Sequence, residues 1–163
     1  MKRIDRIKLD FTRNWKLPGK ERLSHFFKPS ELLKTNMKDG IVWINNEDIA
    51  IYTTADNYIE WTIISTGTYE EEMNKLIRVS LKAGRNALDI GGNIGLQSIR
   101  MSQCVGETGK VYAFEPLNYL QEKFKKNISL NKLHFFIYMF YRFCIGGRNS
   151  NTPGGGFFFL GLR

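Results

Sequence analysis

The sequence predicts an α/β fold in which parallel strands alternate with helices. Residues 86–95, Asn–Ala–Leu–Asp–Ile–Gly–Gly–Asn–Ile–Gly, read as a buried strand that runs into a glycine turn. Residues 110–116, Lys–Val–Tyr–Ala–Phe–Glu–Pro, read as a second buried strand that ends in a carboxylate. The helical pattern between them is long enough for a crossover to a parallel neighbour, and such crossovers are almost always right-handed.

Length and composition are those of one globular domain, with 163 residues of which 42% are hydrophobic and 25% charged. The net charge of +8 is uneven: residues 1–40 carry +6, residues 41–122 carry −5, and residues 123–163 carry +7 with no acidic side chain. Because the centre is acidic, we interpret the basic ends as solvated flanks and disfavour a nucleic-acid partner.

No stretch of the sequence resembles a signal peptide or the ~20 apolar residues of a membrane span. The two cysteines, Cys104 and Cys144, lack the spacing of a metal site and indicate a reducing compartment. We therefore expect a cytoplasmic protein that has no membrane association and no metal.

The N-terminal part is expected to be a small helix and hairpin lead-in. Residues 1–40 are polar and interrupted by Pro–Gly and Pro–Ser pairs, which predicts one or two short helices. Residues 41–44 and 49–52 are β-prone runs joined by Asn–Asn–Glu–Asp, which predicts a hairpin with a structural role.

Helical periodicity begins at Thr68. The spacing of Met73, Leu76, Ile77 and Leu81 predicts a helix that is opened by three glutamates and stopped by Gly84. The remaining elements follow in the order strand 87–90, helix 94–104, strand 111–114 and helix 118–131.

The last thirty residues differ in character from the rest of the chain. Residues 134–143 form a dense aromatic run that is compatible with a third buried strand, residues 146–156 have a loop composition, and residues 157–160 are Phe–Phe–Phe–Leu. An exposed end of this kind is an aggregation hazard, so we expect a truncated or frame-shifted terminus. The expected organisation is a lead-in over 1–66, a partial cofactor-binding domain over 67–133 and an atypical tail over 134–163.

The glycine loop can bind a ligand where it leaves the first strand. Gly91 allows a sharp turn, Gly95 allows close packing of the following helix, and Asn93 tolerates a left-handed backbone. Asp89 at the strand end would accept a hydrogen bond from an ammonium group or a water. A dinucleotide fingerprint would need a third glycine where Leu96 stands, which disfavours a nicotinamide cofactor. An ordinary βα turn remains the alternative.

Glu115 strengthens the ligand interpretation. It lies at the end of the next parallel strand, where a carboxylate can accept both ribose hydroxyls of a bound nucleoside. Pro116 stiffens the exit from that strand. The alternative is a solvated loop glutamate that caps the helix beginning at Asn118.

Four segments together resemble the FkbM group of class I S-adenosylmethionine-dependent methyltransferases. They are Gly67–Thr–Tyr–Glu70, the LDIGGNIG of residues 88–95, the KVYAFEPL of residues 110–117 and Asn127–Ile–Ser–Leu–Asn131. The resemblance covers roughly residues 41–133. It implies a Rossmann-like class I methyltransferase fold, which needs seven strands, so the chain is expected to be truncated after the second or third parallel strand.

The resemblance also implies a cofactor and its site. The loop 88–95 would cradle the methionine part of S-adenosylmethionine, and Glu115 would bind its ribose. The predicted cofactor-binding residues are Asp89, Gly91, Gly92, Asn93, Gly95, Glu115 and Pro116. At Gly92 such proteins commonly carry alanine, so we expect a slightly looser loop. Glu70 would lie near the amino acid moiety, but it fits a helix-opening glutamate equally well and stays outside the predicted site.

The predicted function is methyl transfer to an oxygen of a small molecule or sugar. The sequence assigns no catalytic base, and we interpret His25 and His134 as structural. Two alternatives remain: a non-catalytic cofactor-binding fragment, and an NAD-binding Rossmann protein.

Overall fold

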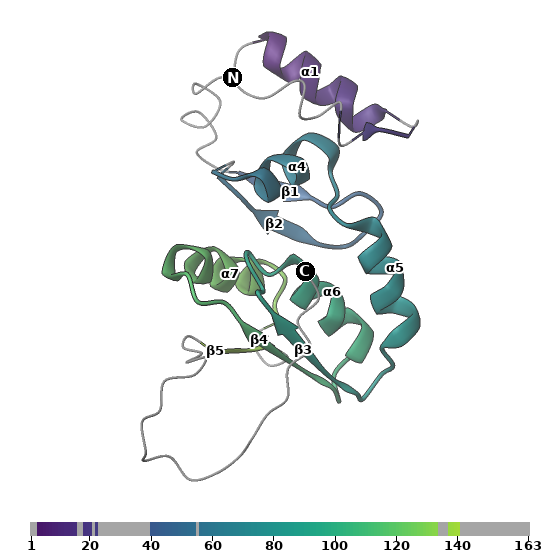
Figure 1. Ribbon diagram of the computed structural model, residues 1–163, viewed down its shortest axis with the longest axis vertical. Helices are drawn as coiled ribbons and strands as arrows, with labels where there is room; N and C mark the ends of the chain where they lie inside the picture. Colours follow the sequence, from purple (N-terminus) through teal and green to yellow (C-terminus); the bar gives the residue numbers. More distant parts are fainter. Residues whose placement is uncertain are drawn as a thin grey trace.

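A computed structural model of the chain describes residues 3–15, 18–20, 22, 40–54, 56–133 and 137–140 (Figure 1). His25, His134, Cys144 and the predicted tail beyond residue 140 lie outside these residues. The elements run in the order α1 (Arg3–Asn14), β1 (Ile41–Trp43), β2 (Ala50–Tyr52), α4 (Tyr58–Thr66), α5 (Glu71–Ser80), β3 (Asn86–Ile90), α6 (Leu96–Val105), β4 (Lys110–Phe114), α7 (Asn118–Leu130) and β5 (Ile137–Phe140).

The predicted α/β fold with parallel strands is confirmed. β3, β4 and β5 form a three-stranded parallel sheet in that order, so the aromatic run does supply a third strand. The register places Asp89 opposite Ala113 and Ile90 opposite Phe114. The glycine loop after β3 and Glu115 after β4 therefore leave the sheet at the same edge.

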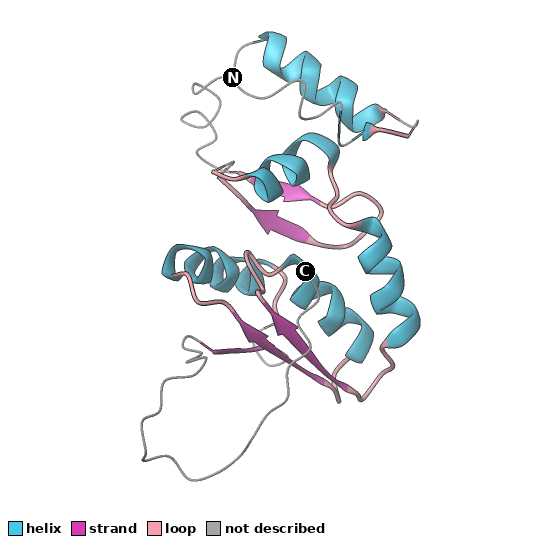
Figure 2. Ribbon diagram, in the orientation of Figure 1, coloured by secondary structure: helices cyan, strands magenta, loops and turns pink. Residues whose placement is uncertain are grey.

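Helices α6 and α7 cover one face of this sheet (Figure 2). Alternate residues of the strands point toward them, and Ala87, Val111 and Ala113 are buried there. The other face carries Leu88 and Ile90, which keep 48% and 44% of their surface exposed. Among the described elements, helices cover only the first face.

The predicted hairpin is also confirmed, as the antiparallel pair of β1 and β2. It lies on the far side of α6 and α7 from the three-stranded sheet, and β2 contacts α7 (Figure 1). The helices are thus enclosed between two sheets. Apolar residues of the hairpin and of the parallel sheet belong to one core, which includes Ile49 and Ile51 on one side and Val111 on the other.

Helix α4 was not predicted from the sequence. Its residues are apolar or small and polar, and most are buried whichever way they face, so it has little amphipathic period. The signals were at its ends. The Asn57 side chain accepts a hydrogen bond from the Glu60 N–H over 3.0 Å, and Gly67 ends the helix in a left-handed conformation with φ of 74°.

Two asparagines, one in α7 and one directly after its last residue, take the place of a neighbouring strand along β2. Asn127 Oδ1 accepts from the Tyr52 N–H over 2.6 Å, and one helical turn later Asn131 Oδ1 accepts from the Ala50 N–H over 3.0 Å. The amide nitrogen of Asn131 also donates to the Ala50 carbonyl over 2.7 Å. The Asn–Ile–Ser–Leu–Asn segment therefore has a structural role, because it satisfies backbone groups at the edge of the hairpin.

Two buried ion pairs make further connections between the hairpin region and the helices. Arg100 of α6 binds the Glu47 carboxylate in the hairpin turn through Nε (3.0 Å) and Nη2 (2.7 Å). Lys123 of α7 binds Glu60 of α4 over 2.6 Å. The side chains of Arg100 and Glu60 are fully buried. Packing is thus continuous across the domain boundary expected between residues 66 and 67, and that boundary stays a prediction.

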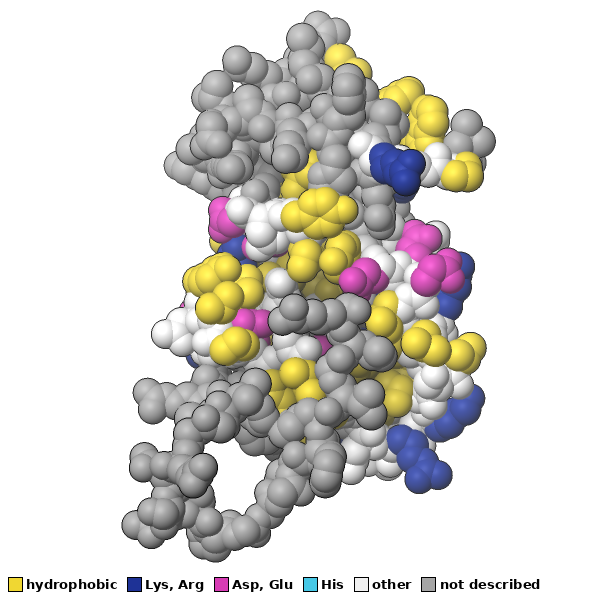
Figure 3. All heavy atoms as spheres, viewed as in Figure 1, with side chains coloured by type: hydrophobic (Ala, Val, Ile, Leu, Met, Phe, Trp, Pro, Cys, Tyr) yellow, Lys and Arg dark blue, Asp and Glu magenta, His cyan; other side chains and the backbone are white. Residues whose placement is uncertain are grey.

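In the described part of the chain, no helix has the length and apolar content needed to cross a membrane. On the face shown in Figure 3, acidic side chains lie across the middle of the molecule, and most of the visible lysine and arginine side chains lie toward its right-hand side.

Candidate functional site

The glycine loop joins β3 to α6 and is tied closely to the end of β4. The N–H groups of Gly91 and Gly92 both donate to the Phe114 carbonyl, over 2.8 and 2.9 Å. The Gly95 N–H donates to the Gly92 carbonyl over 2.8 Å. These amides are therefore engaged within the protein, which leaves the loop less suited to a phosphate group than a dinucleotide-binding turn.

Three loop residues have a left-handed backbone, which the sequence indicated for Asn93. Gly91 and Gly95 have φ of 85° and 93°, and Asn93 has φ of 50°. Gly91 is exposed, and a Cβ added to it would meet no atom within 4 Å. The loop is thus open at Gly91, where a ligand could approach its backbone.

Gly92 and Gly95 face the ring of Phe124 in α7. A Cβ on Gly92 would lie 2.7 Å from Phe124 Cε1, and one on Gly95 would overlap the same ring at Cδ2. Phe124 is completely buried. The departure at Gly92 therefore has a packing reason, since the aromatic ring occupies the space that an alanine side chain would need.

Glu115 is buried, with 4% of its surface exposed, so it is not a solvated loop residue. Its Oε2 accepts from the Asn93 N–H and its Oε1 from the Leu117 N–H, each over 2.9 Å. It does contribute to the entry of α7, as the alternative interpretation proposed. A carboxylate oxygen can accept two hydrogen bonds, so capacity remains for hydroxyl donors of a ligand. Pro116 follows directly and is exposed.

Asp89 lies on the helix-facing side of β3, and its Oδ2 accepts from the Ser98 hydroxyl. Removal from water raises the pKa of the Asp89 carboxyl above its ordinary value, hydrogen bonds from Ser98 oppose this, and the charges of Glu115 and Glu70 add to the increase. The site therefore holds several carboxylates that repel one another.

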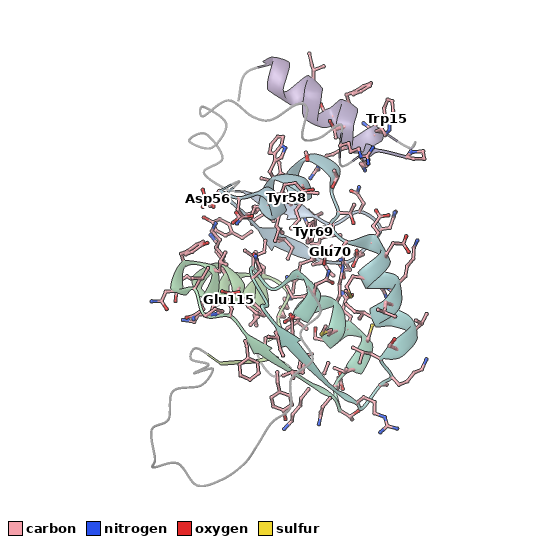
Figure 4. The ribbon with its side chains drawn as sticks, viewed as in Figure 1. Trp15, Asp56, Tyr58, Tyr69, Glu70 and Glu115 are labelled. Carbon is pink, nitrogen blue, oxygen red and sulfur yellow. The ribbon has the colours of Figure 1, made fainter. Side chains whose placement is uncertain are left out.

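Glu70, which the predicted site does not include, lies close enough to interact electrostatically with Asp89. It precedes α5 with a left-handed backbone (φ 49°), which is uncommon for a residue other than glycine. Its Oε2 accepts from Gln97 Nε2 over 3.0 Å in the first turn of α6. Figure 4 shows Glu70 beside Tyr69 at the turn between α4 and α5, and Glu115 beside α7. The signal in the sequence was the Gly–Thr–Tyr–Glu segment.

This arrangement favours a cationic ligand over an anionic one. Three carboxylates, those of Asp89, Glu115 and Glu70, interact electrostatically around the N-terminal end of α6. Among the described residues, no group of three or more histidine, cysteine, aspartate or glutamate side chains has the arrangement to hold a metal ion. A positively charged organic group would relieve the repulsion between these carboxylates.

Several solved structures are similar to parts of the chain. They include a protein-L-isoaspartate O-methyltransferase (18% identity, TM-score 0.42, covering 84% of this chain and 41% of that one). A SAM-dependent methyltransferase from Aquifex aeolicus has 26% identity and a TM-score of 0.38 over 44% of this chain and 37% of its own. The C-terminal domain of precorrin-6Y C5,15-methyltransferase from Rhodobacter capsulatus has 22% identity and a TM-score of 0.41 over 51% of this chain and 52% of its own.

The chain spans about two fifths to one half of the length of these structures. No curated protein matches the chain at a significant level. A family model does match. The model of protein-L-isoaspartate(D-aspartate) O-methyltransferase covers residues 44–145, which is more than half of the sequence and includes the hairpin turn, the glycine loop and Glu115. The chain therefore belongs to the protein-L-isoaspartate(D-aspartate) O-methyltransferase family.

Proposed function

We propose that this chain binds S-adenosylmethionine at loop 89–95 and at Glu115, as part of an enzyme that methylates an oxygen atom. The observation that carries the proposal is the hydrogen bond from the Asn93 N–H to Glu115 Oε2, which brings the acid after β4 onto the glycine loop after β3. Family membership supports the same reaction class.

The residues present fit this cofactor by their chemistry. Glu115 would accept the ribose hydroxyls with its remaining lone pairs, and Asp89 and Glu70 would face the ammonium group. The open side of Gly91 would admit the cofactor next to the backbone. When bound, the cofactor supplies a methyl group on a cationic sulfonium, which an acidic site favours. Pro116 would limit the movement of Glu115 at the strand exit.

The acceptor we place first is a carboxylate, as the name of the family indicates. A carboxylate is ionised at neutral pH, so methyl transfer to it requires mainly in-line placement. The FkbM resemblance implies instead a hydroxyl of a small molecule or sugar, which would also need a general base. Neither histidine of the chain lies among the described residues, so the described part of the chain supplies no imidazole base. We also place the protein in the cytoplasm, on its composition.

Titration calorimetry with S-adenosylhomocysteine tests cofactor binding. We expect saturable heat from the wild-type chain and at least tenfold weaker binding by Glu115→Gln. The matched control is Glu122→Gln on α7, whose exposed carboxylate pairs with Lys125 and should not affect affinity. Absence of heat at high micromolar ligand, or binding of NAD alone, would contradict the proposal.

The acceptor is tested by transfer of a labelled methyl group. An isoaspartyl peptide should become labelled, and the same peptide with ordinary aspartate should not. Labelling of small-molecule or sugar alcohols in its place would favour the FkbM interpretation. Cofactor binding without transfer to either would favour a non-catalytic cofactor-binding chain.

A further inference from the structure

Three buried side chains of α7 contact the candidate cofactor site. Gln121, Phe124 and Asn127 are spaced three residues apart, so each is a neighbour of the next on the helix surface. All three are buried, with exposed fractions of 4%, 0% and 0%. Each contacts a different part of the site, so these side chains do more than fill the core.

The first contact is polar. Gln121 Nε2 donates to the backbone carbonyl of Glu115 over 2.7 Å, so α7 holds the residue that we propose binds the ribose. The second contact is the Phe124 ring, which occupies the space beside Gly92 and Gly95. Because an added Cβ at either glycine would overlap the ring, a side chain at either position would force the loop or the Phe124 ring to move.

The third contact connects the loop to the hairpin. Asn127 Nδ2 donates to the Ile94 carbonyl over 2.7 Å, while its Oδ1 accepts from the Tyr52 N–H over 2.6 Å. A single buried amide therefore joins the centre of the glycine loop to strand β2. Asn131 makes the same kind of contact with β2, but its amide nitrogen donates to the Ala50 and Asn127 carbonyls rather than to the loop.

We propose that Phe124 and Asn127 are positioning residues that hold loop 91–95 in its ligand-binding shape. The hydrogen bond from Asn127 fixes the distance between the Ile94 carbonyl and α7. The Phe124 ring fixes how closely Gly92 and Gly95 approach the same helix. The inference rests on the proposed function for its cofactor, but the shape of the loop can be measured without any ligand. In the sequence, Asn127 is a polar position of an amphipathic helix, and that position alone does not indicate a role in the site.

The first experiment compares Asn127→Ala with Asn131→Ala by hydrogen exchange of the ligand-free full chain. Both variants lose a contact with β2, and only Asn127→Ala loses the bond to the loop. We expect at least tenfold faster exchange in peptides covering residues 91–97 for Asn127→Ala, and no more than twofold for Asn131→Ala. Equal exchange in the two variants would overturn the inference.

The second experiment remains informative if Asn127→Ala does not fold. Gly92→Ala should accelerate hydrogen exchange in the loop and weaken binding of S-adenosylhomocysteine at least tenfold. Adding Phe124→Leu should restore much of the slow exchange and much of the affinity. The same second change should not rescue Gly95→Ala, because φ of 93° strains any residue other than glycine there. Failure of Phe124→Leu to rescue Gly92→Ala, or equal rescue of both, would overturn the inference.

The two proposals fail in different ways. A wild-type chain that gives no heat with S-adenosylhomocysteine contradicts the proposed function. Loop exchange that does not respond to Asn127 or to the pair of Gly92 and Phe124 contradicts the positioning role, whatever the chain binds.

Discussion

The backbone N–H of Asn93 donates a hydrogen bond of 2.9 Å to the carboxylate of Glu115. The two residues follow different strands, and the bond exists because β3 and β4 are parallel neighbours that end at the same edge of the sheet. The other carboxylate oxygen of Glu115 accepts from the Leu117 N–H at the entry of α7. Glu115 therefore orders two loops before any ligand is bound.

Glu115→Ala should weaken cofactor binding by about 2 kcal/mol, or roughly thirtyfold, because a buried charged acceptor is lost. It should also lower the free energy of unfolding by about 1–3 kcal/mol, since the N–H groups of Asn93 and Leu117 lose their acceptor. Calorimetry and urea unfolding measure the two effects. Unchanged affinity in a folded variant would remove Glu115 from the cofactor site.

Asp89→Asn should stabilise the ligand-free protein at neutral pH. The pKa of Asp89 is raised in the folded state, so between its ordinary value of 3.8 and the folded value the native protein binds the extra proton. The contribution of this group to the free energy of unfolding therefore falls as pH rises through that window. Above the window, the full destabilisation from burying the ionised carboxylate is present. Asparagine carries no charge and avoids this cost.

The measurement for Asp89→Asn is urea unfolding at several pH values. The free energy of unfolding of the variant should exceed that of the wild type above this pH window and approach it near pH 3.8. The variant should also bind S-adenosylhomocysteine more weakly, because the ammonium group of the ligand loses a charged partner. Glu107→Gln, an exposed carboxylate between α6 and β4, is the control. A less stable Asp89→Asn at neutral pH would contradict the assignment.

Arg100→Met should lower the free energy of unfolding by about 3 kcal/mol, because the buried Glu47 carboxylate loses its close partner and keeps only the half-exposed Arg78, whose Nη2 lies 3.8 Å away. Adding Glu47→Leu should recover a large part of the loss, since it removes the poorly compensated buried charge. Lys75→Ala removes an exposed pair with Glu72 and should have little effect. A double variant no more stable than Arg100→Met would indicate that packing, rather than charge burial, dominates at this position.

The Lys123–Glu60 pair should make stability depend on pH in the alkaline range. Burial lowers the pKa of Lys123, but hydrogen bonds and charges from Asp56 and Glu60 outweigh it and the pKa is raised above 10.5. Stability from a raised lysine pKa is complete below the ordinary value and is lost as pH rises through the folded value. The wild type should therefore lose stability above about pH 10.5.

The control for this pH dependence is the double variant Lys123→Met, Glu60→Gln. It retains the tyrosines and exposed lysines that also titrate between about pH 9 and pH 12, so the difference between the two curves isolates the buried pair. Parallel curves would show that Lys123 does not gain stability from its partners.

Much of the fold could be predicted because its signals are local. The run from β3 to α7 follows from hydrophobic period and glycine turns, and the boundaries of the helix at 118–131 are within one residue of α7. Helix α4 was not predicted, because burial on all sides removes the hydrophobic period of its sequence. Only Asn57 and Gly67 marked its ends. Residues that meet from distant elements carry no such signal.

The sequence by itself determined the alternation of parallel strands and helices, the glycine loop with Asp89, and the presence of Glu115 after the next strand, because each depends on residues close together in the chain. Only the tertiary structure decided that Glu115 is buried, that Phe124 fills the space beside Gly92, and that Asn127 joins Ile94 to Tyr52. In the sequence Phe124 and Asn127 belong to an ordinary amphipathic helix. Their roles arise from where α7 packs, and packing against distant elements leaves no local pattern.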